Sequence, residues 1–117
     1  MKSDSTDIKK ILFITPPKVQ LLDLTGPIHV FYEAIEYNAP FQLYFASVNK
    51  DIDEVASCAG LQINKLIAFD SIELTSNDYV FVPGINYELF SDISFLSSCT
   101  QFFKWLKIQN KKNVNIC

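Results

Sequence analysis

Two short runs of uninterrupted apolar residues constrain the fold more than any other feature of the sequence. Residues 11–14 (ILFI) are followed closely by a Pro-Pro pair, and residues 79–82 (YVFV) are followed directly by Pro-Gly. Runs of this length and composition are typical of strands that are buried on both faces. Such strands occur in parallel sheets with helices above and below. We therefore expect the two runs to be neighbouring, interior, parallel strands.

A helix is expected between the two runs, because apolar residues recur at helical spacing over residues 24–35. Thr25 or Gly26 would cap this helix, and Pro27 would occupy its first turn, where the missing N–H costs nothing. Residues 41–48 (FQLYFASV) then predict a second strand. Strand, helix and strand in this order form a βαβ unit.

The remaining segments extend the same pattern. Residues 55–69 predict a short, hairpin-like excursion, and an apolar stripe over residues 95–106 predicts a long helix that includes Cys99 on its buried side. Residues 114–117 (VNIC) predict the opening of another strand. The sequence as a whole therefore predicts an α/β fold, a doubly wound parallel sheet.

Length and the two ends of the chain set the domain organisation. At 117 residues the chain has the size of one domain. Residues 1–8 are mostly polar and are expected to form a disordered tail, whereas residues 9–117 carry the α/β pattern. A last strand without a following helix would leave one face of the sheet uncovered. We therefore expect residues 9–117 to be the amino-terminal part of a single larger domain that is incomplete at its carboxyl end.

Charge and hydropathy exclude several classes of function. The chain has ten basic and thirteen acidic residues, a net charge of −3, and no arginine. Such a surface lacks bidentate phosphate contacts and repels polyanions, so these residues are not expected to bind DNA themselves. No apolar run approaches the roughly 20 residues that cross a bilayer. We expect a cytoplasmic protein without a membrane partner.

The cysteines and the single histidine do not predict a metal site. Cys58, Cys99 and Cys117 are odd in number and widely spaced, which favours reduced thiols over disulfides or structural zinc. Cys58 and Cys99 are expected to act as small apolar residues. His29 has no second histidine beside it and is expected at the surface. No metal and no cofactor are predicted.

The candidate site residues lie where strands end, because ligands bind at the carboxyl ends of the strands in doubly wound sheets. Asp23, in LDLTGP just before the expected helix, can be a helix-terminal carboxylate or a group that exchanges a proton with a nucleophile. Gly84 can turn backbone amides toward an oxyanion, or it can simply end the strand. From these residues alone, both alternatives stay open.

The order of these motifs resembles the ThiJ/PfpI superfamily, whose flavodoxin-like fold is similar to that of class I glutamine amidotransferases. The motifs are the first strand, DLTGP opening a helix, a hydrophobic strand ending in VPG, a long helix and a terminal strand near cysteine. DLTGP looks most like the branch that contains isonitrile hydratases and the amino-terminal domains of AraC-type transcription regulators. The resemblance covers residues 9–117 and implies that they form part of a ThiJ/PfpI-like domain.

The resemblance also implies roles for individual residues. Asp23 and Cys117 would be catalytic, and Gly84 and Ile85 would bind the ligand. The family has a second glycine where this chain has Ile85, which puts the shape of that loop in question. Cys117 is either the nucleophile on a strand-to-helix turn or an interior strand residue three positions before it, and we favour the second.

Two functions follow from the resemblance. The first is a small-molecule-sensing or dimerisation domain of an AraC-type regulator, a homodimer that binds an unknown small molecule and contacts DNA only through a helix-turn-helix module outside this chain. Replacement of the second glycine favours this function. The alternative is an isonitrile hydratase or amidase-like enzyme, in which a cysteine attacks the substrate and Asp23 relays protons.

Overall fold

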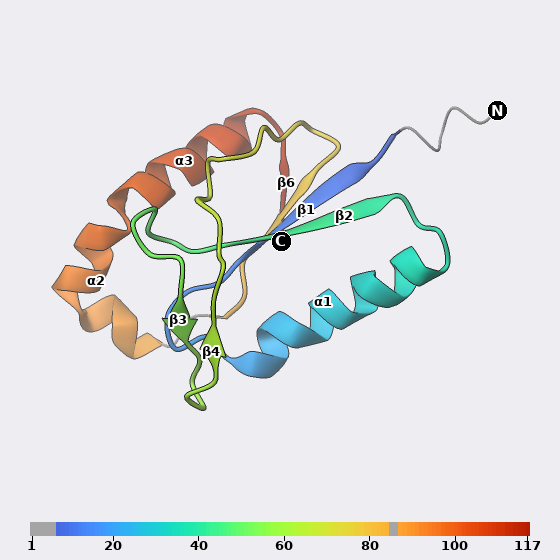
Figure 1. The fold of residues 1–117 in the computed structure, drawn as a ribbon. Coiled ribbons are helices and arrows are strands. Elements are labelled where there is room, and N and C mark those ends of the chain that lie inside the picture. The colour runs from blue at the N-terminus through green and yellow to red at the C-terminus, as the bar shows by residue number, and fades with distance from the viewer. Residues whose placement is uncertain (1–6, 85–86) are drawn as a thin grey trace.

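A four-stranded parallel sheet organises the chain, with helices on both of its faces (Figure 1). The computed structural model describes residues 7–84 and 87–117. Across the sheet the strand order is β2 (Phe41–Ala46), β1 (Lys9–Ile14), β5 (Tyr79–Phe81) and β6 (Asn115–Ile116). The doubly wound α/β fold is therefore confirmed.

The two apolar runs are neighbouring interior strands, as predicted. Ile11 pairs with Tyr79, and β1 is flanked by β2 on its other side. The four residues of β1 that follow Lys10 are fully buried. In β5, Val80 is fully buried, but Tyr79 and Phe81 are only half-buried. These two side chains face the side of the sheet that α1 covers, which is the less completely covered side of β5.

Helix α1 (Leu21–Glu36) begins earlier than the sequence pattern predicts. The expected caps at Thr25 and Gly26 are wrong, because Gln20 occupies the N-cap position and the Thr25 hydroxyl donates to the carbonyl of Leu21 within the first turn. Pro27 lies inside the helix instead of in its first turn. A proline there cannot donate to the carbonyl four residues back, but the short DLTGP segment continues the helix nonetheless. Asp23 is therefore in the first turn of α1, not before it.

The opposite face of the sheet is covered by α2 (Ile93–Ser98) and α3 (Thr100–Lys111). The single long helix expected here is wrong, because the chain breaks at Cys99, which ends α2 and precedes α3. The apolar stripe continues across this break. Phe102 and Trp105 pack on Phe69 with ring centroids 5.4 and 5.3 Å apart, and Cys99 is buried with them.

The predicted excursion forms a small antiparallel hairpin of β3 (Val55–Ala56) and β4 (Gln62–Ile63). Two backbone hydrogen bonds fasten it to the β1–α1 loop: the amide of Lys18 donates to Ala56, and the amide of Cys58 donates to Val19. Figure 1 shows the hairpin beside the start of α1. The hairpin therefore borders the carboxyl end of the sheet.

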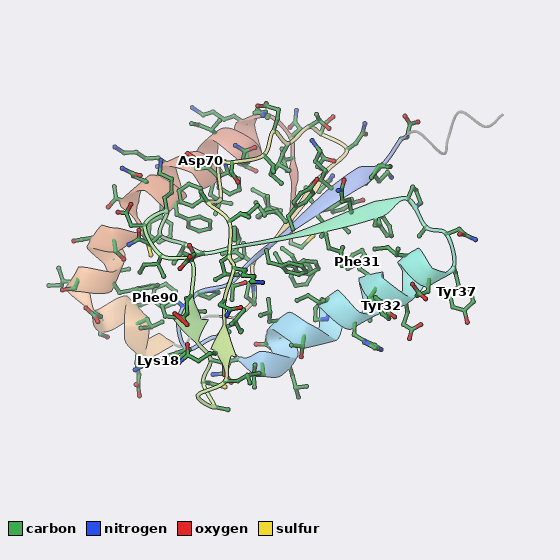
Figure 2. The ribbon with its side chains drawn as sticks, viewed as in Figure 1. Lys18, Phe31, Tyr32, Tyr37, Asp70 and Phe90 are labelled. Carbon is green, nitrogen blue, oxygen red and sulfur yellow. The ribbon has the colours of Figure 1, made fainter. Side chains whose placement is uncertain are left out.

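Two apolar clusters, one on each face, hold the layers together. On the α1 side, Phe13 packs against Phe31, with ring centroids 6.0 Å apart. Figure 2 labels Phe31 between α1 and the sheet. On the other side, Leu12 and Ile14 pack with the aromatic residues of α3. The short 3₁₀ helix η2 (Tyr87–Ser91) leads into α2. Within the described part of the chain, no helix is long and apolar enough to span a membrane.

Candidate functional site

The carboxyl ends of all four parallel strands meet at one edge of the sheet. The chain passes from β1 to β2 on one side and later crosses back to place β5 on the other side of β1, so the sheet changes its winding direction between β1 and β5. In open α/β sheets, the crevice outside the strand ends at such a switch point is the usual place for a ligand. The first turn of α1 begins at this edge (Figure 1). The same edge therefore receives Asp23 from α1 and Gly84 from the segment after β5.

Asp23 and Gly84 lie against each other. A β-carbon placed on Gly84 would come within 2.7 Å of Oδ2 of Asp23 and 3.7 Å of its Cγ. Only a glycine leaves the carboxylate in this position, because any side chain at residue 84 would push it away. The structure thus brings together two of the residues singled out from the sequence.

Buried neighbours position both residues. Leu24 packs in the cluster beneath α1 and anchors the first turn of the helix, while the Asp23 side chain remains exposed. Pro83 is buried and fixes the chain directly before Gly84. The first turn of a helix favours a negative charge, because its backbone N–H groups point outward there. The Asp23 carboxylate can therefore accept hydrogen bonds from a ligand or exchange a proton with it.

Cys117 is held by β5. Its amide donates to the carbonyl of Val80 over 2.9 Å, and its carbonyl accepts from the amide of Val82 over 3.0 Å. The residue therefore continues the parallel ladder of β6, with an exposed thiol. Between described residues, no hydrogen bond joins Cys117 to Asp23. The role assigned to Cys117 stays a prediction, as do those of Asp23 and Gly84, and Ile85 lies outside the described residues.

Among the described residues, neither the other cysteines nor His29 form a hydrogen bond with Asp23. Burial raises the pKa of the Cys99 thiol, and the neighbouring Ser98 hydroxyl offsets part of that rise. Cys58 is exposed in the hairpin. His29 is at the surface as expected, with Nε2 3.5 Å from the carboxylate of Glu33 on the same helix. Among the described residues, no group of three or more potential ligands could hold a metal ion.

Sequence reasoning missed the polar residues that directly follow β1 and β2. Thr15 is buried, and its hydroxyl has no hydrogen-bond partner among the described residues. Ser47 is also buried, and its hydroxyl is shared between the carbonyls of Asn49 and Ile52. The signal that could have found both is a hydroxyl residue placed immediately after an apolar strand.

No family model matches the sequence, and no curated protein matches it. Solved structures do match. DJ-1beta from Drosophila melanogaster is 16% identical, with a TM-score of 0.63 over 93% of this chain and 53% of that chain. An AraC family transcriptional regulator from Pseudomonas putida is 20% identical, with a TM-score of 0.53 over 80% of this chain and 59% of that chain.

A ThiJ/PfpI family protein from Pseudomonas syringae is 25% identical, with a TM-score of 0.53 over 83% of this chain and 40% of that chain. This chain thus spans roughly half the length of the structures it matches. The parallel sheet, the helices on its two faces and these matches agree. The chain has the flavodoxin-like α/β fold of the DJ-1/ThiJ/PfpI superfamily, which confirms the resemblance seen in its sequence.

Proposed function

We propose that the chain is part of a small-molecule-sensing or dimerisation domain of an AraC-type transcription regulator, whose helix-turn-helix module lies outside these residues. One observation carries the proposal: at the strand edge the Asp23 carboxylate occupies the space above Gly84, and no described thiol is hydrogen-bonded to it. A carboxylate in this place can bind a ligand that offers hydrogen-bond donors. Binding of this kind requires no nucleophile.

Cys117 and Cys99 lack the setting of a nucleophile, which agrees with Cys117 being an interior strand residue before the turn. A cysteine nucleophile needs a strand-to-helix turn that exposes its sulfur and lowers its pKa, whereas Cys117 is still paired with β5 through both backbone groups. Cys99 has the opposite character, because burial raises its pKa. The fold of the Pseudomonas putida regulator matches over 80% of this chain, which is compatible with the same use.

The surface charge also agrees with this proposal. With ten lysines, no arginine and a net charge of −3, this part of the protein is poorly suited to hold a phosphate backbone. DNA contacts would then belong to a separate basic module. A regulator that senses its ligand in one module and binds DNA through another would have this distribution of charge.

An enzyme of the isonitrile hydratase or amidase kind is the second candidate. The observation that favours it is the exposed Cys117 thiol, because β6 carries it toward the same sheet edge that receives Asp23 and Gly84. In that function a thiolate attacks the substrate carbon, and Asp23 moves the proton that water supplies.

The test uses the natural polypeptide in which these residues occur, as wild type, Asp23→Asn and Glu36→Gln. Glu36 is an exposed carboxylate at the far end of α1 and serves as the matched control. A library of small metabolites is screened for an increase in melting temperature, and hydration of n-butyl isonitrile to the formamide is followed by proton NMR.

A sensor is expected to yield a ligand that stabilises the wild type and the control but not Asp23→Asn, that changes the affinity for DNA, and that is not consumed. Turnover of the isonitrile by the wild type, lost in Asp23→Asn, would overturn the sensor proposal in favour of the enzyme. A ligand that stabilises Asp23→Asn as strongly as wild type would contradict the role of this carboxylate.

A further inference from the structure

A cavity of about 310 Å³ is lined by residues other than those of the candidate site. Its walls come from four segments: the β1–α1 loop at Pro17, the loop after β2, strand β3 and helix α2. The volume is within the range of small-molecule sites, and these are mostly apolar with a few polar groups. The cavity is therefore large enough for a small organic molecule.

Apolar side chains form most of the walls and are anchored in the core. Val48 and Val55 are buried, and Phe95 packs against the cluster between the sheet and α3. Ile52 also lines the cavity, yet 45% of its surface is exposed. An apolar side chain exposed beside a cavity gains from an apolar ligand that covers it.

Hydrogen bonds fix the positions of the segments that line the cavity. The Ser47 hydroxyl lies 2.5 Å from the carbonyl of Asn49 and 2.6 Å from that of Ile52, which closes the loop after β2 on itself. Strand β3 is fastened by the bond from the Lys18 amide to Ala56, at the point where Figure 2 labels Lys18. A pocket that already exists loses less free energy on ligand binding than one that must be formed.

The polar atoms of the lining are mainly acceptors. Ser47 donates its proton to backbone carbonyls, and Ser98 donates its own to the carbonyl of Phe95, so both hydroxyls offer lone pairs. Asn49 supplies a neutral amide whose oxygen already accepts from the amide of Asp51. Among the described lining residues only Glu54 is charged, and no described ion pair uses its carboxylate. This arrangement favours a positively charged donor.

We propose that this cavity binds a small primary amine, with its apolar body against Val48, Ile52 and Phe95 and its ammonium group at Glu54. The site is separate from Asp23 and holds whether the chain belongs to a sensor or to an enzyme. An ammonium group offers three donors and no acceptor, which matches the lining. A carboxylate of the same length would meet Glu54 with like charge.

The first test compares hexylamine, 1-hexanol and hexanoate in titrations followed by amide NMR shifts at neutral pH. Hexylamine is expected to bind most tightly and hexanoate most weakly, with the shifts at Val48, Ile52 and Val55. In Glu54→Gln the affinity for hexylamine is expected to fall by about two- to fivefold, the range for a charge pair near the surface. Shortening the probe to butylamine is expected to weaken binding by up to about fourfold for each methylene lost from the cavity.

Matched variants separate this site from the rest of the molecule. Ala56→Phe places a ring in the cavity and is expected to abolish hexylamine binding, whereas Ala59→Phe makes the same change elsewhere on the hairpin and should leave it intact. Glu36→Gln controls for the loss of one negative charge. Asp23→Asn should bind hexylamine as wild type does, so this result is independent of the test of the proposed function.

If Ala56→Phe fails to fold, the amide NMR shifts of the wild type still show where hexylamine binds. Hexanol or hexanoate binding as tightly as hexylamine would overturn it. Equal affinity of Glu54→Gln and wild type for the amine, or shifts that centre on α1 at Asp23, would do the same.

Discussion

Replacing Gly84 with alanine tests the contact at the centre of the candidate site. The new β-carbon would lie 2.7 Å from Oδ2 of Asp23, whereas ordinary van der Waals contact begins at 3.4 Å. The carboxylate must therefore move by about 0.7 Å. It can do so, because the clashing atom is the end of an exposed side chain and not backbone.

The expected change in unfolding free energy is small. Alanine restricts the unfolded chain and stabilises by about 0.4 to 1 kcal/mol where its backbone conformation is compatible. Moving Asp23 off its preferred rotamer costs about 0.5 to 1.5 kcal/mol. The two contributions nearly cancel, so Gly84→Ala should stay within about 1 kcal/mol of wild type. Gly26→Ala, where nothing lies within 4 Å of the new carbon, should instead stabilise α1 by about 0.5 to 1 kcal/mol.

Urea unfolding followed by the fluorescence of Trp105, the single tryptophan, measures these differences. A double-mutant cycle with Asp23→Ala isolates the contact, since Gly84→Ala should be more favourable by about 0.5 to 1.5 kcal/mol once the carboxylate is gone. A loss above about 2 kcal/mol from Gly84→Ala in both backgrounds would refute this reasoning, because the obstacle would then be something other than Asp23.

Three further predictions concern the core and the charged groups. Phe13→Ala should lower the unfolding free energy by about 3 to 5 kcal/mol, because the ring is fully buried. Phe103→Ala, on the exposed side of α3, should lower it far less. Equal losses of unfolding free energy in urea would contradict the two-layer core. Cys99 should resist dithionitrobenzoate at neutral pH, since burial raises its pKa, while the two exposed thiols react quickly; three equally fast thiols would count against this packing. The hydrogen bond from Lys112 lowers the pKa of Glu73, so the pair stabilises the fold at neutral pH and this contribution disappears as the pH falls through that lowered pKa. Lys112→Met should raise the pKa of Glu73 toward its ordinary range in a carbon-13 NMR titration, and an unchanged value would show that the pair does not persist in solution.

The sequence predicts the sheet well because continuous apolar runs have few other uses. Residues 11–14 could be assigned to an interior strand, since no helix or one-sided strand needs four consecutive apolar side chains. The ends of helices are harder to predict from the sequence. Thr25, Gly26 and Pro27 predict a helix that starts too late. The helix begins at Leu21 instead, because Leu24 in its first turn packs in the core.

The candidate site could be predicted only in part. Asp23 and Gly84 were singled out from strand ends and from the family resemblance, but the close approach of one to the other depends on how α1 sits on the sheet. The cavity at Glu54 could not be foreseen, because stretches far apart in the sequence, at Pro17, over residues 47–56 and in α2, supply its walls. The local pattern of residues along the sequence does not show which distant segments contact one another in the fold.

The pairing of β1 with β5 also has a consequence for folding kinetics. Ile11 pairs with Tyr79, and the amide of Lys10 donates to the carboxylate of Asp78, 68 residues further along the chain. The centre of the sheet can therefore form only after a long loop has closed, and chains dominated by such distant contacts fold slowly. Until that closure, the apolar β1 has an unpaired edge that can pair with other molecules. Refolding yield should accordingly fall as protein concentration rises.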